Sequence, residues 1–403
     1  MNGMEGYNHQ KVKFSNRNLL FKHIITNDFL SRTDLANLTG LTKMTVTNII
    51  SELLQNNIIA ENKDNPDTSK ITTGRKPSTI ELSAESPCVI GMYISHEFCY
   101  TVLSDLKANI LYSRKLKLSQ DESNDSLVAK LLQPFYFIRE NYKRRLLGIG
   151  IASIGQVDSA NGVLINPLFF YRMVNFPICD MISKATNLPV FLDNDSKVSA
   201  LAEKTFGVGK QYNNFLYLGI SNSIRAGIIT NGELYENNSG LYGQVGHMSI
   251  DINGPKCYCG NNGCLEQYAG INKIVDKACT RIRDHKSSVL WGTIIEWIDI
   301  VEAAMANDYF ATEIINEFCR YISIGLVNVV NILGPEMIVI GHEAAIGGEL
   351  IQKKLETLIN QRTIMPGAKK ISVVISAFKD KTPIIGAVAI VIHKIFTGEL
   401  QLY

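Results

Sequence analysis

The amino-acid sequence predicts an α/β protein that has an N-terminal winged helix-turn-helix followed by a two-lobed α/β domain. Two observations predict this fold class. Three amphipathic segments at the N-terminus are joined by short turns, one of which contains a glycine. From residue 87 onward, strand-like runs alternate with amphipathic helices, and the same order of elements occurs twice. We therefore expect domains 1–82 and 83–403, the second with lobes of approximately 83–194 plus the C-terminal helix, and 195–390.

Composition and charge set only broad limits. The 403 residues suffice for two or three domains with their own cores. The formal net charge of +2 is too small to indicate nucleic-acid binding, although all of it falls within residues 1–82. The N-terminus lacks a signal-peptide pattern, and no apolar run approaches the length of a membrane span. We expect a cytoplasmic protein with reduced cysteines and no membrane partner.

The N-terminal elements follow from capping residues and apolar spacing. A first helix is predicted over residues 16–27. A second begins after Ser31, with Asp34 completing an approximate capping box, and ends at Gly40. Thr42 caps a third helix, in which apolar residues recur at helical spacing as far as Leu54. Runs 58–60 and 78–82 are predicted strands around a polar loop, and this arrangement is typical of a wing.

The third helix has an outer face of small and medium hydrogen-bonding residues, where a solvated helix would favour Glu and Lys. Such side chains can approach phosphates and base edges in the major groove, and a basic wing can enter the minor groove. The alternatives are a solvated loop and a winged helix that binds protein. The candidate DNA-binding residues are Thr42, Lys43, Thr45, Thr47, Asn48 and Ser51 on the helix, and Arg75 and Lys76 in the wing.

The remaining elements form two similar series. Each series opens with three strands of an antiparallel meander and continues with helices and further strands. A cleft between two such lobes is where a ligand is expected. The first series has strands at 88–94, 100–103 and 110–112, helix 127–142, strand 147–152, helix 176–186, strand 190–192 and helix 196–206; the second has strands at 214–220, 225–230 and 233–235, helices from 271, and strands at 336–341 and 371–375.

One short segment concentrates metal-binding side chains. Cys257, Cys259 and Cys264, with His247 upstream, provide the thiolates and imidazole that a structural zinc site requires. Gly260 allows the loop to fold back so that the sulfurs converge. The alternative is that these cysteines are buried and never meet, which we expect for the five others, Cys88, Cys99, Cys179, Cys279 and Cys319.

Several motifs resemble those of the ROK family, named for repressors, open reading frames and sugar kinases. They are Cys259-Gly-Asn-Asn-Gly-Cys264-Leu-Glu266-Gln-Tyr-Ala-Gly270, Gln244-Val-Gly-His247 and Asn194-Asp-Ser-Lys197. The resemblance covers nearly the whole chain and implies an actin/hexokinase-like domain after the winged helix. It is strongest to the xylose-repressor branch, partly through Asn253-Gly-Pro-Lys-Cys257.

The resemblance implies a sugar site. Carried over residue by residue, it assigns sugar-hydroxyl binding to Asn194, Asp195, His247 and Glu266, with Gln244 in place of a glutamate. His247 is then shared between the metal and the sugar, so that the metal supports the ligand site. The alternative for Asn194 and Asp195 is that they only cap the helix that follows them.

Kinase activity is not expected, although Asp195 matches the general base of the family's kinases. Phosphoryl transfer needs glycine-rich turns that hold ATP phosphates. Three such positions have lost glycines. They read Gly91-Met-Tyr-Ile-Ser95, Ile220-Ser-Asn-Ser-Ile-Arg-Ala-Gly227 and Gly341-His342. Lys197 and Arg225 add cations near the cleft, and we expect them to be solvated or paired with Asp195.

The predicted function is that of a sugar-responsive transcriptional repressor of carbohydrate-utilisation genes. Its expected partners are a palindromic double-stranded DNA operator, a small sugar effector and a second copy of the chain, as a homodimer or a dimer of dimers. Alternatives are a sugar kinase with a DNA-binding arm, a regulator that responds to a phosphorylated sugar, an activator, and a DNA-binding protein whose cleft is vestigial.

Overall fold

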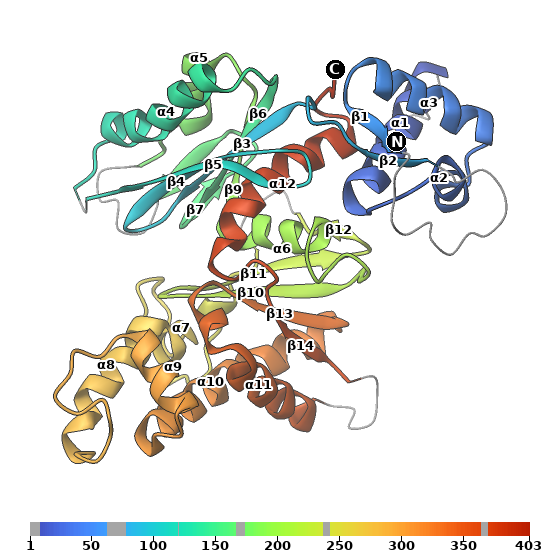
Figure 1. Cartoon of the computed structure of the whole chain (residues 1–403). Helices are drawn as coiled ribbons and strands as arrows, with labels where there is room; N and C mark the ends of the chain where they lie inside the picture. Colours follow the sequence, from blue (N-terminus) through green and yellow to red (C-terminus); the bar gives the residue numbers. More distant parts are fainter. Residues whose placement is uncertain (1–8, 63–77, 120, 167–173, 237–241, 364–369) are drawn as a thin grey trace, which may run out of the picture. The chain divides into compact units, whose positions relative to one another are not determined.

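The computed structural model describes residues 9–62, 78–119, 121–166, 174–236, 242–363 and 370–403 (Figure 1). The chain divides into two compact units. The first consists of residues 1–193 and 387–403, and the second of residues 194–386. The predicted sugar-binding and metal-binding residues all fall in the second unit, and the predicted DNA-binding residues in the first. The predicted domain boundary at residue 82 stays a prediction.

The winged-helix elements match the sequence expectations closely. Helices α1 (His9–Thr26), α2 (Arg32–Thr39) and α3 (Lys43–Gln55) precede the antiparallel strands β1 (Ile59–Asn62) and β2 (Thr79–Leu82). The Ser31–Asp34 capping box is present, and Gly40 ends α2 with φ of 69°. The hydroxyl of Thr42 accepts a hydrogen bond from the backbone N–H of Thr45 and so starts α3.

Helix α1 begins seven residues earlier than the sequence predicts. Its buried residues Leu20, Phe21, Ile24 and Ile25 produce the apolar pattern, and all of them lie in its second half. The first half packs instead against the C-terminal segment, because Phe14 lies directly beside Gly398. Because this contact joins residues far apart in the sequence, it gives the first half of α1 no helical pattern of apolar residues that a sequence could reveal.

The rest of the first unit is a mixed sheet with helices (Figure 1). The strand order is β5-β4-β3-β6-β9, in which β3 pairs antiparallel with β4 and parallel with β6. Leu131 and Phe135 of α4 and Ile182 of α5 belong to the core of this part. The β7–β8 hairpin was not predicted. The bounds are β3 (Cys88–Ile94), β4 (Phe98–Ser104), β5 (Ile110–Lys117), α4 (Asn124–Asn141), β6 (Leu146–Ser153), β7 (Gln156–Asp158), β8 (Val163–Asn166), α5 (Ile178–Thr186) and β9 (Val190–Asn194).

The second unit repeats this plan, as the sequence predicts. Its sheet has the order β12-β11-β10-β13-β14, with an antiparallel β10–β11 pair and parallel β10–β13 and β13–β14 pairs. Phe318 of α10 and Leu355 of α11 share a core with Leu218 and Ile340 of the sheet. The strands are β10 (Phe215–Ile220), β11 (Ile224–Thr230), β12 (Glu233–Leu234), β13 (Met337–Gly341) and β14 (Ser372–Ile375).

The helices of the second unit surround this sheet. The α-helices are α6 (Asp195–Thr205), α7 (Glu266–Ala269), α8 (Ile271–Arg281), α9 (Trp297–Met305), α10 (Tyr309–Leu333) and α11 (Gly348–Arg362). Short 3₁₀ helices are η2 (Val245–His247), η3 (Ile282–Asp284), η4 (His342–Gly347) and η5 (Lys379–Lys381). The last helix, α12 (Thr382–Thr397), contains the division between the units, at residues 386 and 387. Its second half packs in the first unit, where Phe396 meets Phe21 edge to face.

Candidate functional site

The cysteine knuckle, residues 257–264, is a tight loop held by backbone hydrogen bonds. The N–H of Cys257 donates to the carbonyl of Asn261, and the N–H of Gly260 donates to the carbonyl of Cys257. Gly263 adopts φ of 62°, and a Cβ there would lie 1.7 Å from the carbonyl oxygen of Asp251. Only glycine fits this position, so Gly263 is required by the loop itself.

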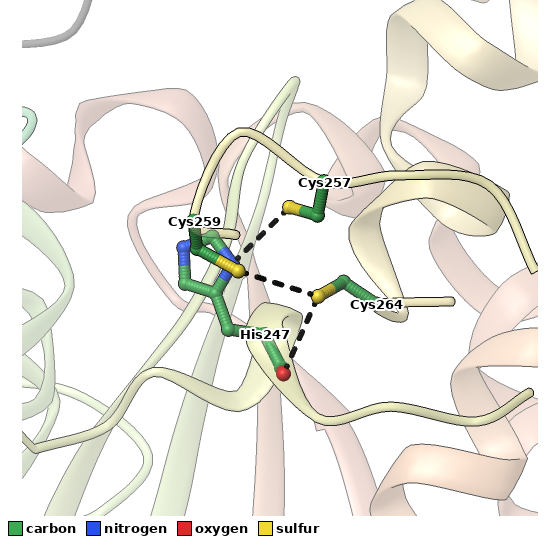
Figure 2. A group of neighbouring side chains, drawn as sticks. All are labelled: His247, Cys257, Cys259 and Cys264. Carbon is green, nitrogen blue, oxygen red and sulfur yellow. Dashed lines mark hydrogen bonds between the residues drawn. The ribbon is translucent and has the colours of Figure 1, made fainter. Parts of the chain in front are cut away.

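The knuckle brings its three sulfurs to the imidazole of His247, which ends η2 (Figure 2). All four donor atoms lie within 4.8 Å of one another. Sγ of Cys257 is 3.6 Å from Nδ1 of His247, and Sγ of Cys259 is 3.6 Å from Sγ of Cys264. A tetrahedral zinc site with bonds of about 2.0 to 2.3 Å requires donor separations of about 3.5 to 3.8 Å. The expectation that these residues meet is confirmed, and the donor set fits a tetrahedral metal ion.

The three thiols of the cluster differ in acidity. Burial raises the pKa of the Cys264 thiol to about 12, and burial also raises the pKa of the Cys257 thiol. The pKa of the Cys259 thiol is lowered, mainly by the backbone hydrogen bond from Asn261. Neutral thiol groups at this distance form only weak hydrogen bonds with one another, so they stabilise the cluster little. A bound cation favours the thiolate form of all three, because metal binding and thiol deprotonation are coupled.

Glu266, the first residue of α7, lies beside this cluster. Its Oε1 is 3.5 Å from Nδ1 of His247 and 3.5 Å from Sγ of Cys257. The hydroxyl of Tyr258 lies 3.0 Å from the other ring nitrogen, Nε2 of His247. Burial and the negative charge of Glu266 raise the pKa of this hydroxyl, so Tyr258 stays neutral. Tyr258 was missed by the sequence reasoning, although its position between two cysteines is a signal that could have identified it.

Asn194 and Asp195 occupy the start of α6. The side-chain oxygens of both accept a hydrogen bond from the backbone N–H of Ser196, so the alternative that they cap the helix describes part of their role. Asp195 has a second partner. Its Oδ2 is 3.1 Å from Nε2 of His342, and Nδ1 of the same ring is 3.1 Å from the hydroxyl of Tyr217.

The electrostatics of this pair favour an ionised carboxylate. Asp195 is only 5% exposed, and burial opposes its ionisation. The hydrogen bond and charge of His342 outweigh burial, and with the charge of Arg225 they lower the pKa of Asp195 below its ordinary value. The pairing of His342 with Asp195 was not predicted from the sequence, where His342 was noted only as the replacement of a glycine.

Gln244 precedes η2, and its carbonyl accepts a hydrogen bond from the N–H of His247. This backbone contact ties it to the cluster. The sugar-binding role of its side chain stays a prediction.

In the first unit, α3 presents the predicted polar face to solvent. Thr42, Lys43, Thr47 and Asn48 are exposed, whereas Thr45 and Ser51 are partly buried. Ser51 Oγ donates to the carbonyl of Thr47 and is therefore engaged within the helix. Met44, 76% exposed in the first turn, is a further surface residue of α3 that the sequence reasoning overlooked. Arg75 and Lys76 lie outside the described residues.

Comparisons with known proteins identify the family. The family model described as "ROK family" matches residues 90–394. The chain belongs to the ROK family. It is 29% identical over 396 residues to the xylose repressor of Caldicellulosiruptor bescii, covering 96% of this chain and 97% of that protein. It is 32% identical over 225 residues to a glucokinase of Halalkalibacterium halodurans, covering 53% of this chain and 66% of the kinase.

A solved ROK structure extends the similarity to the fold of the whole chain. The crystal structure of a ROK family transcriptional regulator, described as a homologue of the Escherichia coli Mlc protein, superposes with a TM-score of 0.81 at 28% identity. The match covers 96% of this chain and 97% of that one. The predicted fold class, a winged helix-turn-helix before a two-lobed ROK domain, is confirmed.

Two cations of this ROK domain were expected to be either solvated or paired with Asp195. Lys197 and Arg225 are 5% and 8% exposed, so of these two alternatives solvation is wrong. Nζ of Lys197 lies 3.8 Å from the centre of the Tyr242 ring. Arg225 lies close enough to Asp195 to lower its pKa. Both residues belong to largely buried elements, Lys197 to α6 and Arg225 to β11.

Among the described residues of this ROK chain, no helix is long and apolar enough to span a membrane.

Proposed function

We propose that this ROK protein is a sugar-responsive, DNA-binding transcriptional repressor of carbohydrate-utilisation genes, acting in the cytoplasm where its DNA lies. The observation that carries the proposal is the exposed, hydrogen-bonding face of α3 in a chain that matches a named xylose repressor from end to end. Thr47 and Asn48 supply the donors and acceptors needed to contact bases, and Lys43 supplies charge for phosphates. The wing residues Arg75 and Lys76 are proposed to add phosphate or minor-groove contacts.

The proposed effector is a small sugar bound by Asn194, Asp195, Gln244, His247 and Glu266. Carboxylates, an amide and an imidazole can together donate to and accept from neighbouring hydroxyls. The side chains of His247 and Glu266 lie close together, which supports this assignment. The lowered pKa of Asp195 supports it as well, because an ionised carboxylate accepts hydrogen bonds. A sugar that left these groups unpaired would bind poorly, and this requirement is the source of selectivity.

The proposed metal is a structural Zn²⁺ ion held by His247, Cys257, Cys259 and Cys264. When bound, it supplies a fixed anchor for the knuckle and has no place in a reaction. Nδ1 of His247 faces the sulfurs, so the ring is oriented with Nε2 directed away from the cluster. The metal site therefore holds the imidazole in a position from which it can bind a ligand.

A kinase with a DNA-binding arm is the disfavoured rival. Gly219 of β10 has the Nδ1 and Cε1 atoms of His342 and the Oγ of Ser196 within 2.7 Å of where a Cβ would stand. The imidazole thus fills the space beside this strand end, and His342 itself stands where the resemblance to the family implies a glycine. Isothermal titration with ATP and Mg²⁺ tests the point, because tight nucleotide binding would support the kinase.

Sugar binding can alter DNA binding only if the sugar has a higher affinity for one arrangement of the protein than for another. Couplings of this kind are commonly worth about 1 to 3 kcal/mol. A symmetric homodimer, or a dimer of dimers, would place two α3 helices on a roughly palindromic operator with half-sites whole helical turns apart.

A band-shift titration with operator DNA tests the proposal. Upstream DNA of the regulated genes should bind at low salt, and the complex should dissociate on addition of one member of a panel of pentoses, hexoses and their phosphates. Failure to bind any DNA would reject the function, and DNA binding that no sugar alters would support the vestigial cleft. A complex that is stabilised by sugar would indicate co-repression or activation.

A phosphorylated sugar is a second candidate effector, favoured by one observation. Arg225 is a buried cation whose charge reaches both Asp195 and His247. If Arg225 binds a phosphate, Arg225→Ala should weaken the response to a phosphosugar and leave the response to the neutral sugar unchanged. Lys256→Ala, which removes an exposed cation next to the knuckle, is the matched control. Equal effects of Arg225→Ala on both ligands would reject this candidate.

A further inference from the structure

Tyr258 combines an exposed ring with a hydroxyl that reaches the predicted sugar-binding residues. The residue is 59% exposed, yet its hydroxyl lies 3.0 Å from Nε2 of His247. The two rings meet edge to face, with centroids 5.1 Å apart and an interplanar angle of 81°. The negative charge of Glu266 also acts on this hydroxyl and helps to raise its pKa. One side chain therefore contacts His247 directly and interacts electrostatically with Glu266, a second of the five groups assigned to the sugar.

These contacts occupy the atoms that a ligand needs. Nδ1 of His247 faces Sγ of Cys257 at 3.6 Å and belongs to the His-Cys cluster. Nε2 is the nitrogen left for a ligand. A phenolic hydroxyl and a sugar hydroxyl have the same capacity, since each donates one hydrogen bond and accepts through oxygen lone pairs. The hydroxyl of Tyr258 thus takes the hydrogen-bonding position that a hydroxyl of a bound sugar would take.

The ring has little holding it in place. More than half of the residue is in contact with solvent, so rotation away from His247 removes little packing. Two residues further along the loop, a Cβ built on Gly260 meets nothing within 4 Å, so the loop is open at that point. Release of the hydroxyl therefore costs chiefly its hydrogen bonds, which a bound sugar replaces.

We infer that Tyr258 is an internal competitor of the effector, one that must leave His247 and Glu266 before a sugar hydroxyl can take its place. The inference rests on the proposed sugar site. It makes Tyr258 a specificity-determining residue. Only a ligand that offers hydroxyls to both groups forms hydrogen bonds that offset the loss of the Tyr258 interactions. A ligand that reaches one of them leaves the other unpaired once Tyr258 has moved.

Tyr258→Phe isolates the hydroxyl and keeps the ring. Isothermal titration of wild type and variant with D-xylose, D-glucose and their phosphates should show Kd about threefold to tenfold lower in the variant, the worth of one net hydrogen bond. Tyr268→Phe is the matched control, because its hydroxyl contacts Asp251 and lies outside the sugar-binding set. Its Kd should match that of wild type, and both variants should keep the wild-type metal content.

A second measurement separates displacement from a structural effect. In wild type, the ¹⁵N resonance of His247 Nε2 should move on addition of the bound sugar, and Tyr258→Phe should move it before any sugar is added. An unchanged or weaker affinity of Tyr258→Phe would overturn the inference and leave the sugar site standing. If neither protein binds any sugar of the panel, the proposed function fails as well, whereas binding by the variant alone supports the competitor role.

Discussion

Asp195 and His342 form a buried hydrogen-bonded pair, with Oδ2 of the carboxylate 3.1 Å from Nε2 of the imidazole. The carboxylate that matches the base of the family's kinases thus has a fixed partner in this chain. His342 adopts φ of 57°, a conformation that costs a non-glycine residue about 1 kcal/mol or more. The pair links the first residue of α6 to the turn after β13.

Removal of the imidazole should therefore destabilise the second unit. His342→Ala leaves the Asp195 carboxylate buried without this partner, and breaking a buried pair in this way typically costs about 3 to 5 kcal/mol. Thermal unfolding of wild type and variant measures the loss. The double variant Asp195→Asn with His342→Ala removes the carboxylate charge, which the single variant leaves with Arg225 as a neighbouring cation, and should recover part of the lost stability. If His342→Ala alone is as stable as wild type, the contact between Asp195 and His342 contributes nothing to the stability of the fold.

Metal removal should abolish the sugar response before it abolishes DNA binding. We expect one zinc ion per chain by elemental analysis. Cys259→Ser should lower this content and the response to sugar, since it removes a ligand that is exposed and leaves no core cavity. Operator binding without sugar should persist, because α3 lies in the other unit. Cys279→Ser, which changes an exposed cysteine outside the cluster, is the control. A chelated protein that still senses sugar would contradict the proposed support of His247 by the metal.

Helix α3, which is proposed to contact DNA, gives a prediction that separates base contacts from phosphate contacts. Thr47→Ala and Asn48→Ala should each weaken operator binding by about 1 to 3 kcal/mol if they read bases, and relax the sequence preference. Lys43→Ala should weaken binding to all sequences and reduce the salt dependence by about one unit of slope. Band shifts at two salt concentrations, with operator and scrambled DNA, measure both effects. A Thr47 or Asn48 variant with intact sequence preference would assign that residue to positioning on the backbone.

The parts of the fold that were predictable have local causes. The Ser31–Asp34 capping box, the left-handed Gly40 and the Thr42 cap are each read within four residues, and all three are present. The cysteine knuckle was equally accessible, because the ligand types and the two glycines fall within one short segment. The repeated strand order followed from apolar runs, which a buried sheet requires.

What the sequence could not provide depends on distant contacts. His342 is separated from Asp195 by 147 residues, and no pattern links them. Tyr258 adjoins the ligands in sequence, but its contact with Nε2 of His247 depends on how the loop folds back. The burial of Lys197 and Arg225 was missed for a related reason. Charged residues are usually solvated, and only the position of their elements inside the unit shows otherwise.

A final relationship joins α3 to the end of the chain. Glu52, near the C-terminus of α3, receives a hydrogen bond from the hydroxyl of Tyr403 and lies 2.7 Å from Nζ of Lys13. The guanidinium of Arg17 lies 4.6 Å above the Tyr403 ring. The hydrogen bonds from Lys13 and Tyr403 lower the pKa of Glu52 below its ordinary value of 4.5. This cluster fixes the helix that is proposed to contact DNA against the C-terminal segment.

The contribution of Glu52 to stability should consequently depend on pH in a definite direction. A carboxyl whose pKa is lower in the folded than in the unfolded protein stabilises the fold above its unfolded pKa, and this stabilisation is lost as the pH falls through the folded pKa. Glu52→Gln should cost about 1 kcal/mol at pH 7, and the difference in melting temperature from wild type should shrink below pH 4.5. Tyr403→Phe should reproduce part of the loss, whereas Glu85→Gln, a change to an exposed carboxyl, should have no effect. A melting difference for Glu52→Gln that is constant from pH 7 to pH 3 would show that packing of the side chain, and not its charge, supports α3.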